Sequence, residues 1–352
     1  MQSIDRTWFE PKGFGQIITS GLKACFSGGA APYVAAAVCF IPAVIAQFVA
    51  AYLMGDMGVA EMQAQLKAGT LDPTTVDPMV SIKAQLVNLG STVVFVIACY
   101  FAGAACARTI AERVVGKAAS AFSTWDFLMG SAFRILGASI VQGIICGIAL
   151  VVCLLPGVAA LVGVAMSTGG GVAALQSPPV LAYVAFGLVT GLPLMAVITY
   201  VFLMPMITGT ESSGTFASVG RSFALIKGNF FLSFGIMLVA SIVCGGVISL
   251  AGWAGPKLLL ESLQASMGQG LGMAVASLPQ IILLAVVTPI EYAVFTALYL
   301  HLRAKNSEEP FSPRELAIDV GYELPASEAV EGASLPESPV AADDASEPNS
   351  SS

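Results

Sequence analysis

Six long apolar stretches constrain the fold of this 352-residue chain more than any other feature of its sequence. Each is long enough to cross the hydrocarbon core of a bilayer, which requires roughly 20 apolar residues in a helix. The sequence therefore predicts an all-α polytopic membrane protein with six transmembrane helices. The expected spans cover about residues 32–54, 85–107, 135–158, 179–205, 231–253 and 274–298.

The composition supports a membrane protein. Only 11% of the residues are charged and the mean hydropathy is +0.83, whereas soluble domains usually carry about 25% charged residues. The seven cysteines are odd in number and form no CxxC motif. We interpret them as small buried hydrophobic residues and expect neither a disulfide framework nor a metal site nor a cofactor.

The net charge of -7 belongs to the C-terminal tail, residues 306–352. This tail holds eleven acidic residues and one basic residue, whereas the remaining chain holds 14 bases and 11 acids. Ser312-Pro313-Arg314-Glu315 predicts a capped short helix at about 313–320. The composition beyond Leu324 predicts disorder. The acidic tail could recruit a basic protein partner, and the alternative is a plain solvated tail.

Three amphipathic stretches precede the first, third and fifth spans. They cover residues 14–26, 123–137 and 216–226, and the second begins with a capping-box-like pair, Ser123 and Asp126. A short helix with one apolar face and basic residues between two membrane segments is expected to lie in the headgroup plane. In the third stretch the apolar face is spaced by three and four residues and consists of Phe216, Val219, Phe223 and Ile226.

The chain therefore has a threefold order, in which an interfacial helix is followed by an outgoing and a returning span. Eleven of the fourteen basic residues outside the tail flank the spans on the side of the termini. Positively charged residues favour the cytoplasmic side, so both termini are expected in the cytoplasm.

Glu291 is the one acidic residue inside an expected span. Such residues normally face the bundle interior or water, and they often mark proton, ion or solute sites. The alternative is a neutral, hydrogen-bonded structural glutamate. Gln47 and Gln142 are the other polar groups near the middle of a span and are candidate partners for Glu291.

Arg221 and Lys227, on the third interfacial stretch, are candidate contacts for an anionic lipid headgroup. The alternative is that they only anchor the helix. Two GxxxG pairs are expected to allow close helix packing, namely Gly143 with Gly147 and Gly187 with Gly191.

Catalysis is not expected. The only histidine is His301, at the edge of the sixth span, and the chain contains no HExxH, P-loop or GxSxG motif.

The third interfacial stretch also carries a family resemblance. The pattern Pro205…Glu211…Ser218-Val-Gly-Arg-Ser222…Leu225-Ile-Lys-Gly-Asn229-Phe-Phe resembles a six-helix bacterial membrane family. That family includes the membrane domain of some glycerophosphoryl diester phosphodiesterases and stand-alone relatives of the YciC type. Leu154-Leu-Pro-Gly157 and Thr296-Ala-Leu-Tyr-Leu-His-Leu-Arg303 are similar to other family motifs.

The resemblance covers roughly residues 14–305 and implies architecture more than activity, since the soluble catalytic barrel of the phosphodiesterases has no counterpart here. It also implies a bacterial cytoplasmic membrane.

We therefore expect a non-catalytic multi-pass protein that assists lipid or envelope homeostasis or a partner membrane protein. Membrane lipids are the expected ligands, and no nucleic acid is expected. The alternative is a transporter of a small solute or ion that uses Glu291. It draws support from prolines expected to break the spans, at Pro42, Pro193, Pro279 and Pro289.

Overall fold

The computed structural model describes residues 6–10, 12–27, 29–56, 78–167, 180–211, 213–306 and 312–322. Every regular element in these ranges is helical. Six helical stretches are long and apolar enough to cross a membrane: Ala31–Met54, Ile82–Val114, Ala132–Val164, Val180–Thr210, Phe230–Leu250 and Ala274–Asn306. The predicted all-α architecture with six membrane-spanning helices is confirmed. The tail beyond residue 322, for which disorder is predicted from Leu324 onward, lies outside the described ranges.

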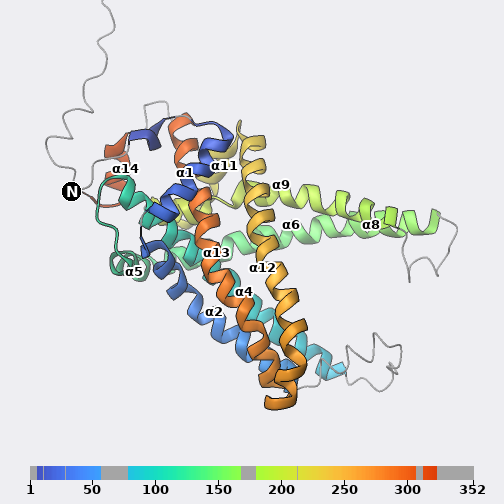
Figure 1. Ribbon diagram of the computed structural model, residues 1–352. Coiled ribbons are helices and arrows are strands. Elements are labelled where there is room, and N and C mark those ends of the chain that lie inside the picture. The colour runs from blue at the N-terminus through green and yellow to red at the C-terminus, as the bar shows by residue number, and fades with distance from the viewer. Residues whose placement is uncertain are drawn as a thin grey trace, which may run out of the picture.

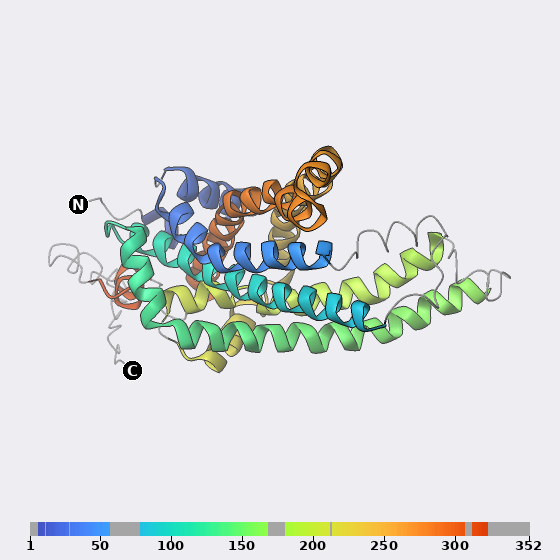
Figure 2. The same cartoon turned by 90° about the horizontal axis from the view of Figure 1, so that it is seen from below.

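The six spans form three helix pairs that share one end of the molecule (Figures 1 and 2). Pair 1 consists of α2 (Ala31–Asp56) and α4 (Pro78–Val114). Pair 3 consists of α12 (Phe230–Met267) and α13 (Gln269–Asn306). Pair 2 consists of α6 (Ala132–Ser167) and a returning span made of four segments. These segments are α8 (Val180–Phe186), the π-helical turn η2 (Gly187–Gly191), α9 (Leu192–Val201) and α10 (Met204–Thr210). From the shared end pairs 1 and 3 run in a similar direction and pack on each other, whereas pair 2 runs away from both in Figure 1.

Four shorter helices gather at the end that the pairs share, which we call the base. They are α1 (Phe14–Ser27), α5 (Ala121–Gly130), α11 (Thr215–Ile226) and α14 (Pro313–Asp319). A 3-10 turn, η1 (Arg6–Phe9), precedes α1. Three of them, α1, α5 and α11, correspond to the predicted interfacial helices, whose placement at a membrane interface remains a prediction.

Two predicted boundaries are wrong. The second short helix begins at Ala121, because Ser120 is its N-cap and accepts a hydrogen bond from the Ser123 backbone nitrogen at 3.0 Å. Ser123 therefore holds the third helical position, which a glutamate or glutamine fills in the usual capping box. The loop expected between the fifth and sixth spans is largely helix. Residues 257–267 are mostly good helix formers, and the turn is left to Gly268, whose φ of 84° suits glycine.

The prolines do not break the spans as predicted. Pro42, Pro279 and Pro289 lie inside continuous helices. Pro193 lies at the start of α9, directly after the π-helical turn. Such a turn accommodates the hydrogen bond that proline cannot donate.

The three short helices pack in a cyclic order. Helix α1 packs on α13 of pair 3, α5 packs on α2 and α4 of pair 1, and α11 packs on α6, α9 and α10 of pair 2. Helices α5 and α11 thus each pack on the pair that precedes them in the chain, and α1 packs on pair 3. At Gly21 of α1 the approach is so close that a Cβ would lie 2.5 Å from the Cα of Val294. The threefold order of the sequence has a counterpart in the packing.

The hydrophobic core lies at the base, where the returning spans end. Residues 102–111, 201–210 and 293–303 are buried throughout. Small residues permit this convergence. A Cβ on Gly209 of α10 would lie 2.8 Å from the Cα of Ala104 on α4, and one on Gly103 would collide with Tyr292 of α13 and Pro205 of α10.

Pair 2 is mostly bare outside the base. Only 11% of the most apolar stretch of each of its spans is buried, compared with 53% for the sixth span. The packing role expected for the two GxxxG pairs is wrong, because a Cβ on Gly143, Gly147, Gly187 or Gly191 would meet no described atom within 4 Å. Helix α6 instead meets η2 through Gly157 and Thr190.

Candidate functional site at the base

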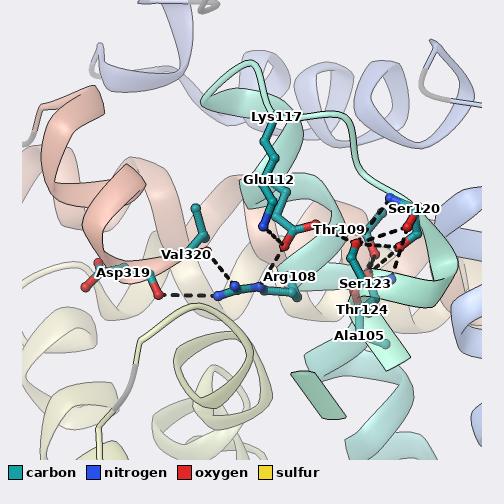
Figure 3. Close-up of polar contacts among 10 residues, drawn as sticks. All are labelled: Ala105, Arg108, Thr109, Glu112, Lys117, Ser120, Ser123, Thr124, Asp319 and Val320. Atoms are coloured by element: carbon teal, nitrogen blue, oxygen red, sulfur yellow. Dashed lines mark hydrogen bonds and ion pairs between the residues drawn. The ribbon is translucent and has the colours of Figure 1, made fainter. Parts of the chain in front are cut away.

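A buried carboxylate joins α4 to the start of α5 (Figure 3). The Glu112 side chain is 1% exposed, and its Oε1 lies 3.1 Å from Arg108 Nε and 2.8 Å from Lys117 Nζ. The Ser123 hydroxyl donates to its other oxygen at 3.4 Å. A buried carboxylate requires such partners. The spacing of four residues between Arg108 and Glu112 is a sequence signal that could have identified this pair.

The C-terminal helix α14 is held on the base by two arginines. Arg108 donates to the backbone oxygens of Asp319 at 3.3 Å and Val320 at 2.5 Å, as Figure 3 shows. Arg303 Nη1 lies 2.6 Å from Asp319 Oδ2. The apolar face of α14 is buried against the same core, through Leu316, Ala317 and Val320. The beginning of the tail is therefore an integral part of the base.

Glu211 links three elements of the base. It follows α10 and accepts a hydrogen bond from the Tyr299 hydroxyl at 2.7 Å. Arg303 Nη1 lies 3.1 Å from the same hydroxyl oxygen and 3.7 Å from Glu211. Arg221 Nε lies 3.4 Å from Glu211. Glu211 thus connects α10, α11 and α13.

The two residues predicted to bind a headgroup have different surroundings. Arg221 is 42% exposed and already has the Glu211 carboxylate as a partner. Lys227 is exposed at the C-terminal end of α11.

Asn229 fixes the turn between α11 and α12. Its side-chain oxygen accepts from Lys305 Nζ at 2.6 Å, and its amide donates to Asn306 at 3.0 Å. Asn306 in turn donates to the Leu225 backbone oxygen at 2.7 Å. With Gly228 at a φ of 88°, the Lys-Gly-Asn sequence has a structural role in attaching the turn to the end of α13.

Glu291 lies in α13 and accepts a hydrogen bond from the Ser241 hydroxyl of α12 at 3.0 Å. The expected partnership with the two glutamines is not observed. Within the described residues, neither Gln47 nor Gln142 shares a hydrogen bond with Glu291.

The two glutamines lie on other helices. Gln47 is on α2, and the side-chain oxygen of Gln142 on α6 is buried without a hydrogen-bond partner among the described residues. Sequence reasoning missed Ser241, because a serine in an apolar helix carries no signal of which helix it faces.

Two side chains of the base that could act as nucleophile or metal ligand, Cys25 and His301, are engaged in hydrogen bonds within the chain. The Cys25 thiol donates to the Tyr33 hydroxyl at 3.0 Å. Burial raises the pKa of Cys25 above its usual value, so it stays a neutral, weakly nucleophilic thiol. His301 accepts the backbone N–H of Lys12 at 2.9 Å. The described residues contain no group of three or more His, Cys, Asp or Glu side chains that could hold a metal ion.

Comparison with protein-family models, curated proteins and solved structures finds no match to this chain. The resemblance to the six-helix bacterial family therefore remains a prediction.

Proposed function

We propose that this chain is a non-catalytic multi-pass protein of the bacterial cytoplasmic membrane that assists lipid or envelope homeostasis or a partner membrane protein. The observation that carries the proposal is the contrast between a well-packed base and the bare helices of pair 2. Pair 2 leaves most of its apolar surface bare. Such surfaces require lipid or another apolar partner beside them.

The proposal places the base at the cytoplasmic headgroup level. Basic residues that favour that side collect there, among them Arg113, Lys117 and Arg134. Large aromatic side chains on the short helices are exposed, as expected for anchors at a membrane interface. They include Phe26, Phe122, Trp125 and Phe216.

The test is purification in nanodiscs of mixed bacterial lipid, followed by mass spectrometry of the retained lipids and proteins. We expect one lipid class, or one membrane protein, to be enriched relative to empty discs of the same composition. A lipid profile identical to that of the empty discs, with no accompanying protein, would contradict the proposal.

A transporter is the second candidate, favoured by Glu291. An acid at the centre of a span costs about 2.5–3.5 kcal/mol on insertion scales, and Glu291 has one hydroxyl partner from a neighbouring span. Proton uptake by proteoliposomes under an imposed membrane potential tests it, with a pH-sensitive dye as the probe.

Uptake that is lost in Glu291→Gln and kept in the double variant Arg221→Glu with Lys227→Glu would establish the transporter. A growth phenotype that survives Glu291→Gln but is lost in the double variant would exclude it.

A further inference from the structure

Arg134 differs from Arg108, Arg113 and Arg303 in its place along its helix. Arg108 and Arg303 lie in the last two turns of their helices, where the helix dipole favours a cation, and both pair with acids. Arg113 lies beside the C-terminal carbonyl groups of α1, through Ala24. Arg134 is the third residue of the 36-residue helix α6. The dipole at this end disfavours a cation.

The contacts of Arg134 do not neutralise its charge. Its Nη2 donates to the Ser131 hydroxyl and to the Thr208 backbone oxygen, both at 3.2 Å. Its Nε is buried without a hydrogen-bond partner among the described residues. In the part of the chain that the structure describes, no carboxylate lies within ion-pair distance of Arg134.

A second cation increases the imbalance. The guanidinium groups of Arg108 and Arg134 lie 4.4 Å and 5.7 Å from the centre of the Phe127 ring. All the hydrogen bonds of Arg108 go to acceptors of the chain itself, namely Glu112, Asp319 and Val320. Each of the three nitrogen atoms of Arg108 thus already donates to an acceptor of the chain, and its main contribution to the joint is positive potential. Lys117 shares the single carboxylate of Glu112.

A half-buried cation without a counter-charge is unfavourable. An anion beside Arg134 would gain a charge-assisted hydrogen bond, the potential of Arg108 and the favourable field at the start of α6. The apolar side chains around the joint between α5 and α6 suit a ligand with acyl chains. Phe133 is 91% exposed, and Met129 and Trp125 are exposed as well.

We propose that the α5–α6 joint binds a phosphate group, that of an anionic lipid headgroup, with Arg134 as its direct ligand. This deepens the proposed function, because it rests on the base lying at the headgroup level. Arg221, which the sequence favours, is the weaker candidate, since Glu211 already compensates its charge.

The test compares two variants that each remove one positive charge from the base, Arg134→Gln and Arg221→Gln. The full chain in a neutral detergent is titrated with phosphatidylglycerol, phosphatidylcholine or inorganic phosphate, while the unfolding temperature is followed. We expect phosphatidylglycerol to stabilise the wild type more than the other two ligands. Its apparent affinity should fall about tenfold or more in Arg134→Gln, the worth of one hydrogen bond to a charged group, and stay near wild type in Arg221→Gln.

Arg134→Lys keeps the charge with a single-point donor and should bind with intermediate affinity. If Arg134→Gln does not fold, Arg134→Lys replaces it in the titration. An affinity of Arg134→Lys for phosphatidylglycerol equal to that of the wild type would then overturn the proposal. Equal losses in Arg134→Gln and Arg221→Gln, or equal responses of the wild type to the two lipids, would overturn it too. A response to inorganic phosphate that matches phosphatidylglycerol would overturn the lipid assignment.

Enrichment of a lipid in nanodiscs that does not depend on Arg134 would leave the proposed function in place and remove this site.

Discussion

The apolar span Val180–Thr210 runs from the outer part of pair 2 into the base, and its two ends have opposite surroundings. Residues 201–210, where the returning span reaches the base, are all buried. A few turns away, Leu188 and Leu192 in the same span are exposed. The apolar character of a segment therefore does not show whether it packs inside the protein or leaves a bare face that requires an external partner.

The difference follows from how closely the backbones approach. At the base, Gly103 and Gly209 let α4, α10 and α13 meet with almost no space between them. Farther out pair 2 diverges from the other pairs, so a Cβ on Gly143, Gly147 or Gly163 of α6 would meet nothing among the described residues. Without a hydrophobic driving force in lipid, helix association depends on such close packing. We expect the stability of the described chain to reside mainly in the base.

The strongest test of this comparison is Glu112→Gln. The substitution leaves the buried Arg108 and the half-buried Lys117 without their shared carboxylate, and breaking a buried ion pair costs roughly 3–5 kcal/mol. We expect a large fall in the free energy of unfolding, measured by SDS titration in mixed micelles. Asp126→Asn, at an exposed acid on α5, is the control and should change little. A small effect of Glu112→Gln would mean that the base is not the stabilising region.

A more direct test compares the same substitution in both regions. Gly209→Ala forces a methyl group into the Ala104 backbone, and overpacking of a tight core costs about 1–3 kcal/mol. Gly147→Ala adds a methyl group to an open face of α6. Because alanine has a higher helix propensity than glycine, this variant should be more stable than the wild type by up to about 1 kcal/mol.

The measurement is thermal unfolding of both variants in one detergent. A destabilised Gly147→Ala would show that another chain or segment covers this face.

The smallest expected destabilisation lies at Gly157, where α6 approaches η2 within pair 2. A Cβ on Gly157 would collide with the Thr190 side chain, but a side chain can rotate away whereas the Ala104 backbone cannot. We expect Gly157→Ala to cost less than Gly209→Ala, about 1 kcal/mol. Hydrogen exchange should rise in η2 and α9 and stay unchanged in α4 and α13. Increased exchange at α4 would show that pair 2 and the base unfold together.

The contrast between Arg134 and Arg221 teaches a similar lesson about charge. Both are basic residues on or beside an amphipathic helix, and the sequence singled out Arg221 with Lys227. Glu211 lies ten residues before Arg221, and nothing in that spacing indicates a pair. The turn after α10 brings Glu211 to Arg221, Tyr299 and Arg303. No comparable carboxylate reaches Arg134 within the described residues.

Several features were determined by the sequence itself. The apolar stretches set the number of spans, because a bilayer demands a fixed length of apolar helix. Local signals placed α1 and α11, and the Ser312 cap and Gly228 mark helix ends where the structure has them. These features depend on residues a few positions apart, which is the range over which helix periodicity and capping act.

Only the tertiary structure decided which surfaces are core, which charges are paired and which glycines matter. The partner of Glu291 is Ser241, 50 residues away, and that of Arg303 is Asp319 on α14. Neither pairing follows from local pattern, because both depend on the angles at which helices cross. The convergence of three returning helices at the base, a consequence of small residues far apart in the chain, set those angles.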